Sequence, residues 1–373
     1  MHKRPLNVLV VYPFLFHYRF GVFQQLDRSP ELRLTFASDT RTFDGIEAID
    51  PHLVARHKKL KTIRINRFTW QTGLAKLITT EAYDAVVFHG DMWSISTWIA
   101  SAIARIRRKK VFFWTIGWHR PDKGLMKFIR LSFYKLAHEL LIYGNVGKSI
   151  GKSMGYPEDT MTVIYNSHVS SKSATNDRQN HSILIEASNI PTIGAVIRLN
   201  AVKRLDLMLK SAAILRDRGE PVRIILAGEG PEAETLRALG LNLGLEVTFV
   251  GSIYSAHQIE QFYEKVDLTV VPAAAGLTVI QSMSHGVAVI TDDDDFGQMP
   301  EAEAVIDGVT GGRFKSGDAN ALADTIRTWL DFLEVDPLRI DRATRREVQL
   351  NWTPEAQADR IQRRLLRHLG SPE

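Results

Sequence analysis

Short apolar, β-branched runs alternate with segments of helical periodicity through the first half of the chain. Predicted strands lie at 7–12, 33–37, 85–88, 110–114, 140–143 and 162–165, and predicted helices lie between them near 20–27, 71–80, 94–107, 123–137 and 146–154. Strands that alternate with helices in this way are typical of parallel sheets covered by helices. The first half is therefore predicted to be an α/β domain.

The same pattern restarts after a polar stretch without periodicity, SSKSATNDRQN at 170–180. The second set of predicted strands is 193–198, 222–228, 247–250, 268–271 and 287–291, the last closing the series, with helices at 205–218, 231–239, 256–263, 277–285 and 320–332. A basic amphipathic helix at 354–368 is predicted to begin behind Thr353 as its cap, with Pro354 at its first position. We therefore expect an N-terminal domain (1–169), a linker (170–190), a C-terminal domain (191–350) and a final helix (351–373) that packs back toward the first domain.

Composition narrows the class of protein. Apolar residues make up 45% and charged residues 24% of the chain, as in soluble globular proteins. No apolar run reaches the roughly 18–20 residues that span a bilayer. The start is basic and then apolar, like a signal peptide, but its β-branched residues and the lack of a convincing cleavage site favour a first buried strand. The absence of cysteine excludes disulfides and fits a reducing cytoplasm.

The net charge of +5 hides an asymmetry between the halves. Residues 1–180 hold 27 Lys and Arg against 14 Asp and Glu, whereas residues 181–373 hold 20 against 28. A basic half beside an acidic half indicates two domains with different partners, although ordinary surface variation is the alternative.

The segment 266–286, VDLTVVPAAAGLTVIQSMSHG, carries the clearest sign of a ligand. A β-branched run ends at Pro272, small residues follow, and an apolar-periodic segment begins near Leu277. A helix that starts directly after a strand offers unpaired N–H groups and the positive end of its dipole to an anion. Arg198, Lys203 and Arg204 follow another strand, where two phosphates could bind, so a nucleotide-type ligand is expected.

Six motifs in order carry a family resemblance: RL-x3-K, AGEGPE, FVG, D-x-x-V-x-P, GL-x3-Q-x-M-x-x-G and PE…DG-x-TG. Over 193–318 they resemble the nucleotide-sugar domain of the retaining family-4 glycosyltransferases. That likeness implies the GT-B fold, in which two doubly wound Rossmann-like domains face each other across a cleft and bind ligands at the carboxyl ends of their strands. It also implies a nucleotide-sugar donor, no cofactor and no metal ion.

The resemblance implies roles for particular residues. Arg198 and Lys203 would hold the donor diphosphate, and the backbone at Gly276, Leu277 and Thr278 would bind the phosphate and the transferred sugar. The family usually has two glutamates eight positions apart here, where this chain has Ala273 and Gln281. Gln281 can still hydrogen-bond a ribose hydroxyl, but Ala273 puts the usual contact to the sugar in doubt.

Acidic residues downstream offer two kinds of site. A looser similarity to bacterial polysaccharide transferases, through GLT…GVAVIT and QMPE-x-EA, implies that Glu301 and Glu303 replace the missing carboxylate; an exposed, acid-rich helix start is the alternative. The run Asp292–Asp295 could bind Mn²⁺ or Mg²⁺, but we favour a solvated acidic loop that caps a helix and expect no metal site.

Three places in the first half could line the cleft. His17, Tyr18 and Arg19 stand between the first strand and its helix, where Arg19 could meet an acceptor phosphate. By a loose likeness to the family's histidine, His119 would lie near the transferred sugar and orient it or donate a hydrogen bond. His89 is a rival one strand earlier. Each of these residues could instead have a purely structural role.

Basic segments in the first half predict a partner surface: RIRRKK at 105–110, KFIRLSFYK at 127–135 and HKKLKTIRINRF at 57–68. Cations mixed with Phe, Ile and Leu are typical of a peripheral contact with an anionic membrane. Nucleic acid would also attract such segments, but no recognition motif accompanies them, and we expect no nucleic-acid partner.

Together these observations predict a cytoplasmic enzyme, peripheral on the inner face of the membrane. It would move a sugar from a nucleotide donor to a hydroxyl of a lipid-linked bacterial glycan, such as an exopolysaccharide, O-antigen or capsule. By resemblance the reaction would retain the anomeric configuration. Two alternatives stay open: an inactive sugar-nucleotide-binding partner of another transferase, and a nucleotide-sugar epimerase of the same fold.

Overall fold

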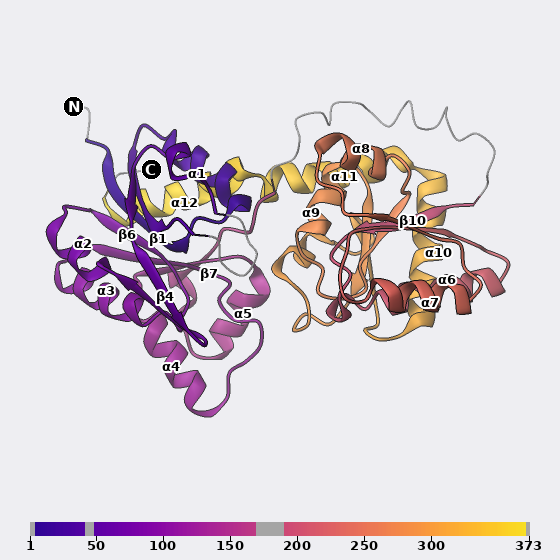
Figure 1. Ribbon diagram of the computed structural model, residues 1–373, viewed down its shortest axis with the longest axis horizontal. Coiled ribbons are helices and arrows are strands. Elements are labelled where there is room, and N and C mark those ends of the chain that lie inside the picture. Colours follow the sequence, from indigo (N-terminus) through magenta and orange to yellow (C-terminus); the bar gives the residue numbers. More distant parts are fainter. Residues whose placement is uncertain (1–3, 42–47, 169–189, 371–373) are drawn as a thin grey trace. The chain divides into compact units, whose positions relative to one another are not determined.

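The structure is a computed structural model that describes residues 4–41, 48–168 and 190–370 (Figure 1). The chain divides into two compact units. The first comprises Met1–Val169 together with Thr353–Glu373, and the second comprises Ser170–Trp352. The predicted linker, apart from Ile190, lies outside the described residues.

A seven-stranded parallel sheet forms the centre of the first unit, in the order β3-β2-β1-β6-β7-β8-β9. Its strands are β1 (Leu6–Phe14), β2 (Leu32–Asp39), β3 (His57–Lys59), β6 (Ala85–His89), β7 (Lys110–Thr115), β8 (Glu139–Ile142) and β9 (Met161–Val163). All six strands predicted for this half are confirmed, with ends that differ by a few residues. Continuous apolar runs identify them because a parallel sheet is buried on both faces.

Helices cover both faces of this sheet, as Figure 1 shows. One face carries α1 (Phe20–Asp27) and α12 (Pro354–His368); the other carries α2 (Leu74–Thr80), α3 (Ile95–Ile106), α4 (Gly124–Tyr134) and α5 (Asn145–Ser153). The side chain of Thr353 caps α12, as predicted, by accepting a hydrogen bond from the N–H of Ala356. Arg364 and His368 of α12 bind the fully buried carboxylate of Glu139 at 2.7 and 2.6 Å, which fixes this helix to the first unit.

An antiparallel hairpin in the first unit, β4 (Lys61–Ile65) and β5 (Phe68–Thr72), was missed by the sequence analysis. Residues 57–68 were interpreted only as a basic segment, and residues 71–72 were wrongly included in the helix predicted at 71–80. The strands are short and only Thr62 and Gln71 are buried, so the hairpin lacks the apolar alternation that marks a half-buried strand. Asn66 adopts a positive φ of 53° at its turn.

The second unit contains a six-stranded parallel sheet in the order β12-β11-β10-β13-β14-β15. Its strands are β10 (Thr192–Val196), β11 (Arg223–Ala227), β12 (Val247–Gly251), β13 (Leu268–Val270), β14 (Ala288–Asp292) and β15 (Gly311–Phe314). The prediction that 287–291 closes the series was wrong, because β15 continues the sheet beyond it. Two glycines hide β15 in the sequence, yet Gly311 is required: a Cβ there would lie 1.9 Å from the carbonyl oxygen of Val289.

The helices of the second unit pack in two groups (Figure 1). The helices of this unit are α6 (Leu205–Asp217), α7 (Ala233–Asn242), α8 (Ala256–Tyr263), α9 (Leu277–Ser284), α10 (Ala319–Val335) and α11 (Pro337–Glu347). Helix α10 packs on α6 and β15, while α9 packs on α11 and β14. Helix α11 was not predicted, because its residues are mostly charged. Within the described residues, no helix has the length and apolar character needed to cross a membrane.

Candidate functional site

Each sheet reverses its strand order at one place. In the second unit β10 leads to β11 on one side, whereas β13 leads to β14 on the other. In the first unit the same reversal occurs between β1 and β6. Loops diverge at such a switch point, and ligands of doubly wound sheets bind at the carboxyl ends of the strands there. Both switch points are therefore candidate sites.

At the switch point of the second unit, two side chains tie β10 and the loop after it to the loop after β13 and the start of α9. Lys203 Nζ donates a hydrogen bond of 2.6 Å to the carbonyl oxygen of Ala274. The hydroxyl of Thr278 donates to the carbonyl oxygen of Val196 at 2.7 Å. Of the other two predicted cations, Arg198 is exposed at the end of β10, and Arg204 forms an ion pair with Asp206.

The loop 273–276 leads into the amino end of α9, and Gly276 at the N-cap position provides no side-chain cap. Ala274 has a positive φ of 49°, a conformation that is costly for a residue with a Cβ. Gln298 holds the next residue in place: its Oε1 accepts a 2.7 Å hydrogen bond from the N–H of Ala275, and its Nε2 donates to Thr291 at 2.7 Å. The buried side-chain amide of Gln298 thus fixes the loop before α9. The amino end of α9 has no side-chain cap, so its N–H groups could bind an anion.

Gln298 is a site residue that the sequence analysis missed. It lies inside the QMPEAEA motif, which drew attention only to the two glutamates. The side chain is 7% exposed and also donates to the carboxylate of Asp292. Nothing in the sequence around this glutamine indicates that its side chain will contact the loop after β13.

Glu301 and Lys203 are brought close together. Glu301 is 3% exposed in the 3-10 turn Pro300–Ala304, so the exposed-acid alternative does not hold for it. Burial lowers the pKa of the Lys203 ammonium, and the charge of Glu301 acts in the opposite direction. Glu303 is half-buried in the same turn. Glu301 is thus the carboxylate whose charge acts on Lys203.

Gln281 lies one turn into α9, where its Oε1 accepts a hydrogen bond of 3.3 Å from the hydroxyl of Tyr263. The ring of Tyr263 stacks on His285 with centroids 4.7 Å apart. Ala273, at the other end of the loop, adds no polar side chain. The two positions where the family carries glutamates therefore differ in chemistry, since only Gln281 presents polar atoms.

Two glycines after β11 bring a second loop against the site. A Cβ on Gly228 would lie 1.9 Å from the carbonyl oxygen of Ile197, and one on Gly230 would lie 2.0 Å from that of Leu199. Backbone therefore packs directly on backbone next to Arg198. This close approach explains the AGEGP motif as a structural support of the site.

Three residues of the acidic run Asp292–Asp295 are exposed, as expected for a solvated loop, but the first is buried. Asp292 is 4% exposed, and its carboxylate accepts hydrogen bonds from Gln298 and, at 2.7 Å, from the hydroxyl of Ser316. Asp295 pairs with Arg313 at 3.3 Å. Over the part of the chain that the structure describes, no group of three or more His, Asp or Glu side chains is arranged to hold a metal ion.

At the switch point of the first unit, the predicted residues His17, Tyr18 and Arg19 form a single 3-10 turn between β1 and α1. His17 is exposed, Tyr18 is half-buried and Arg19 is buried. His89 ends β6 next to this turn, with its ring 5.2 Å from that of Tyr12. Desolvation and the charge of Arg19 lower the pKa of His89 to about 4, so its imidazole is neutral at pH 7.

The loop after β7 holds His119 at the surface. The buried ring of Trp118 anchors this loop by packing against Tyr134, with centroids 4.8 Å apart. Desolvation and the charges of Arg130 and Arg120 lower the pKa of His119, which favours a neutral imidazole. The structure thus places His119 at the carboxyl end of a strand, as expected, and its role remains a prediction.

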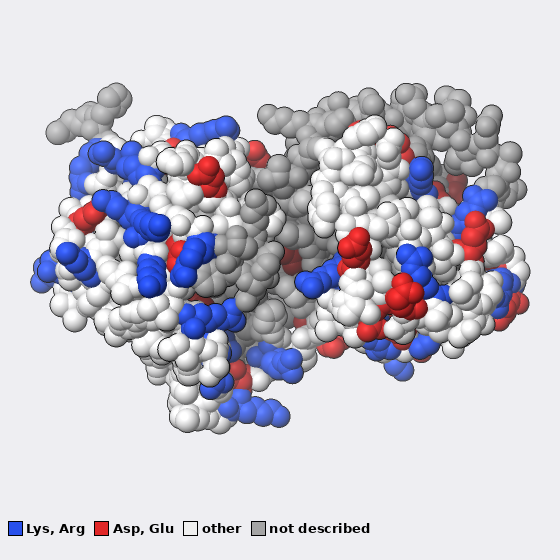
Figure 2. All heavy atoms as spheres, viewed as in Figure 1, with Lys and Arg blue, Asp and Glu red and all other residues white. Residues whose placement is uncertain are grey.

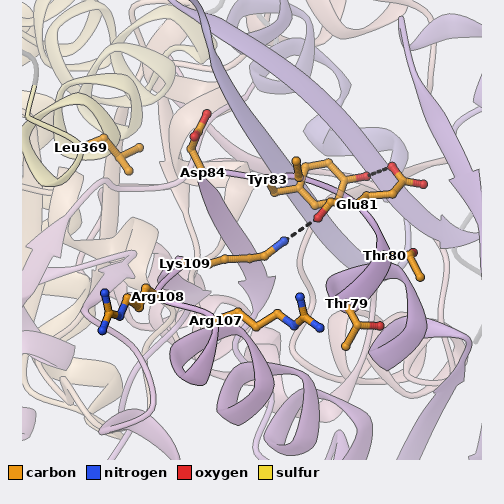
Figure 3. A pocket seen from close by; sticks show the side chains of 10 residues that line it. Thr79, Thr80, Glu81, Tyr83, Asp84, Arg107, Arg108, Lys109 and Leu369 are labelled. Atoms are coloured by element: carbon orange, nitrogen blue, oxygen red, sulfur yellow. Dashed lines mark hydrogen bonds between the residues drawn. The ribbon is translucent and has the colours of Figure 1, made fainter.

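A cavity of about 500 Å³ lies at the opposite edge of the first sheet, near the amino ends of β6 and β7 (Figure 3). Three of its charged groups, Glu81, Asp84 and Lys109, already have partners. Lys109 Nζ donates to the carbonyl oxygen of Glu81 at 2.6 Å, and Asp84 pairs with Arg4 at 2.8 Å. This cavity lies at the amino ends of the strands, whereas the topology predicts a site at their carboxyl ends.

Positive charge is concentrated on the first unit. Figure 2 shows more Lys and Arg than Asp and Glu on its visible face, whereas both signs are mixed on that of the second unit. Exposed apolar side chains accompany this charge on the hairpin, α3 and α4; we call them the apolar-basic surface, and they are Ile65, Phe68, Ile95, Ile99, Ile106, Leu125 and Phe128. The three elements are neighbours, since β5 contacts α3 and the rings of Trp98 and Phe133 join α3 to α4.

Comparison with known proteins agrees with this geometry. Residues 176–339 match the family model "Glycosyl transferases group 1". EpsD of Bacillus subtilis (strain 168), which is named as a glycosyltransferase, is 24% identical over 269 residues, covering 68% of this chain and 69% of EpsD. This sequence match therefore extends beyond the second unit.

Solved structures show the same fold over nearly the whole chain. Anabaena HepE, crystallised with UDP, has a TM-score of 0.70 at 15% identity, covering 97% of this chain and 99% of HepE. The lipopolysaccharide outer core galactosyltransferase WaaB, in its apo form, has a TM-score of 0.71 at 15% identity, with 97% and 100% covered. The chain is therefore a glycosyltransferase with the GT-B fold, and residues 176–339 carry its glycosyl transferases group 1 domain.

Proposed function

We propose that the protein transfers a sugar from a nucleotide-sugar donor to a hydroxyl group of a lipid-linked bacterial glycan. The observation that carries this proposal is the switch point of the second unit, where Lys203 and the open amino end of α9 offer positive charge to a diphosphate. Proteins of the same fold support it: HepE was crystallised with UDP and with UDP-glucose, and WaaB is a lipopolysaccharide outer core galactosyltransferase.

In the proposed reaction the bond between the sugar and the diphosphate breaks as the acceptor oxygen bonds to the anomeric carbon. The departing diphosphate takes the acceptor proton on the same face, so the anomeric configuration is retained. Lys203, Arg198 and the N–H groups at Leu277 and Thr278 stabilise the charge that develops on the diphosphate. Glu301 and Glu303 are proposed to contact the sugar in place of the missing side chain at Ala273, and Gln281 is proposed to contact the ribose.

His119 is proposed to act on the transferred sugar. A neutral imidazole can donate one hydrogen bond and accept another, and its lowered pKa favours that neutral form. It would orient the transferred sugar rather than exchange a proton with it. Divalent metal is proposed to be unnecessary, so addition of EDTA should leave the transfer rate unchanged.

Ala273 also supports a second candidate, an inactive sugar-nucleotide-binding partner of another transferase. One experiment distinguishes the active transferase from the inactive partner. The purified chain is first screened by thermal shift against UDP-, GDP- and dTDP-linked sugars, because a ligand that binds the native state raises its melting temperature. The best donor is then tested for hydrolysis and for transfer to polyprenyl-diphosphate-linked glycans. Binding without turnover would favour the inactive partner, and no binding of any donor would contradict both readings.

The acceptor is proposed to be reached at an anionic membrane through the apolar-basic surface, on the inner face of the cytoplasmic membrane. Leu125 and Phe128 are 74% and 65% exposed on α4, and Lys123 and Lys127 lie beside them. Apolar side chains ringed by cations suit a bilayer interface with anionic lipids.

Vesicle sedimentation tests this surface. The chain should bind phosphatidylglycerol vesicles and not phosphatidylcholine vesicles, and the double variant L125E/F128E should lose at least tenfold in binding. The matched control is L241E/V335E in the second unit, whose side chains are 79% and 84% exposed. Equal loss in both variants, or preferential binding to RNA, would contradict the proposal.

A further inference from the structure

Arg19 is a buried cation whose hydrogen bonds are incomplete. Its side chain is 5% exposed. One guanidinium nitrogen, Nη2, donates to the hydroxyl of Tyr143. The Nε and Nη1 atoms are buried and have no hydrogen-bond partner among the described residues. Because a guanidinium does not lose its proton in a protein, the charge persists in this environment.

Aromatic rings, rather than carboxylates, surround the guanidinium. Its Cζ lies 5.0 Å from the ring centroids of Trp114 and Tyr143, 5.4 Å from that of Tyr18 and 5.7 Å from that of Tyr12. These rings come from β1, the turn after it, β7 and the end of β8. Cation–π contacts of this kind offset part of the cost of burying the charge. They leave the N–H donors in the guanidinium plane unsatisfied.

Other arginines of the same unit show how a structural arginine is satisfied here. Arg130 is bound by Asp122 at 2.5 Å, and Arg364 is bound by Glu139 at 2.7 Å. Arg19 is more deeply buried than either of them and, among the described residues, forms no ion pair with an Asp or Glu. A buried charge without a counter-charge destabilises the protein that carries it. A purely packing role would be served better by an apolar side chain.

The place of Arg19 in the fold suggests which kind of ligand completes its hydrogen bonds. It lies at the carboxyl end of β1, beside His89 at the end of β6, and these are the two strands of the first unit's switch point. Ligands of doubly wound sheets bind at this edge. Tyr18, which is stacked on Phe16, is half-buried, whereas the other three rings around the guanidinium are buried.

We propose that Arg19 is a preformed receptor for a phosphate or diphosphate group of a substrate, which binds its Nε and Nη1 donors when Tyr18 moves aside. The planar fork of a guanidinium matches two oxygens of one phosphate. The proposal rests on the proposed function, because glycosyl transfer supplies two sources of that group. One is the diphosphate of a lipid-linked acceptor and the other is the diphosphate of the nucleotide donor.

Binding measurements on the full chain test the proposal, with inorganic pyrophosphate, farnesyl diphosphate and UDP as probes. R19M removes the charge and keeps an unbranched side chain of similar length. R28M is the matched control, since Arg28 is an exposed arginine at the end of α1. R19M should bind pyrophosphate at least tenfold more weakly than the wild type, and R28M should bind it as the wild type does. R19K should be intermediate, because it keeps the charge but not the fork.

The other two probes identify the source. If R19M weakens the binding of farnesyl diphosphate and leaves the binding of UDP unchanged, the phosphate belongs to the acceptor. If R19M weakens the binding of UDP, the phosphate belongs to the donor. Either result supports the receptor. Wild-type affinity of R19M for all three probes overturns it.

Protein stability provides an independent check. Without ligand, R19M should melt at the same temperature as the wild type or higher, because the uncompensated charge is gone. Should R19M fail to fold, R19K decides, and it must bind pyrophosphate more weakly than both the wild type and R28M. If R19M or R19K melts several degrees lower and the affinity of R19K is unchanged, the role is structural and the proposal is wrong. If UDP fails to bind even the wild type while pyrophosphate binding depends on Arg19, the proposed function fails and the receptor stands.

Discussion

The two units reverse their strand order in the same way, yet they place different chemistry at the reversal. In the second unit the cation is Lys203, which contacts a backbone carbonyl beside an uncapped helix and a buried glutamate. In the first unit the cation is Arg19, which lies among four aromatic rings and forms no ion pair with a described residue. One site is made mainly of backbone and the other of side chains from separate elements.

The difference shows how far a shared topology determines a site. Parallel sheets with a switch point offer the same edge to a ligand in both units. A site built from backbone needs glycines, small residues and a helix start at fixed spacings, so it leaves a motif in the sequence. A cage built from β1, β7 and the end of β8 leaves no such motif, because its members are distant in the chain. Three experiments can break or sharpen this comparison.

Lys203 should show the largest effect. K203M removes the ammonium that we assign to the donor diphosphate, and removal of one such group typically costs roughly 100- to 1,000-fold in rate. We expect kcat/KM for the donor to fall by about that factor while pyrophosphate binding at Arg19 is unchanged. Steady-state kinetics and calorimetric titration measure the two quantities.

The control for this variant is K210M, on an exposed lysine of α6 that pairs with Asp206. Its kinetics should match those of the wild type. A near-normal kcat/KM of K203M would contradict the proposal that Lys203 stabilises the donor diphosphate.

Gln298 should show a smaller effect. Q298A deletes the acceptor of the Ala275 N–H and the donor to Thr291, which leaves buried polar groups unsatisfied at a cost of about 1–3 kcal/mol. We expect the free energy of unfolding to drop by that amount, measured in urea, and the donor KM to rise about tenfold as the loop loosens. Q261A, at an exposed position of α8, should change neither quantity. A normal donor KM in Q298A would mean that the loop conformation does not depend on this amide.

The smallest effect is a pH dependence that should arise in the first unit. Desolvation and nearby positive charges lower the pKa of both His89 and His138 to about 4. The unfolded chain takes up these protons near pH 6.5, so it binds more protons than the native state between pH 6.5 and 4. Stability is therefore full above pH 6.5 and falls as the pH drops toward 4.

We expect the melting temperature of the full chain to decrease by roughly several degrees between pH 7.5 and 5. H89N and H138N should each reduce that decrease, whereas H257N, on an exposed histidine of the second unit, should not. If the decrease is the same in all three variants, it originates elsewhere in the molecule.

The strand-and-helix order was predictable because burial on both faces of a parallel sheet requires continuous apolar runs. The hairpin Lys61–Ile65 and Phe68–Thr72 escaped because it is mostly exposed. The strand Gly311–Phe314 escaped because two glycines replace the apolar residues that mark a strand. Within the site, Lys203 and the start of α9 could be found from spacing, whereas Gln298 could not, since nothing local to it shows that it reaches the Ala275 N–H.

By itself, the sequence determined the α/β class, the fold resemblance, and the small-residue loop before a helix start, with Ala273 and Gln281 in place of two glutamates. Those features depend on local periodicity and on residues close together in the chain. Only the tertiary structure decided that the buried charge of Glu301 acts on Lys203, that Asp292 is buried and bound by Gln298, and that Arg19 lies among rings without a carboxylate. Each of those is a contact between distant segments, and whether a charge is buried or paired depends on what the fold brings to it.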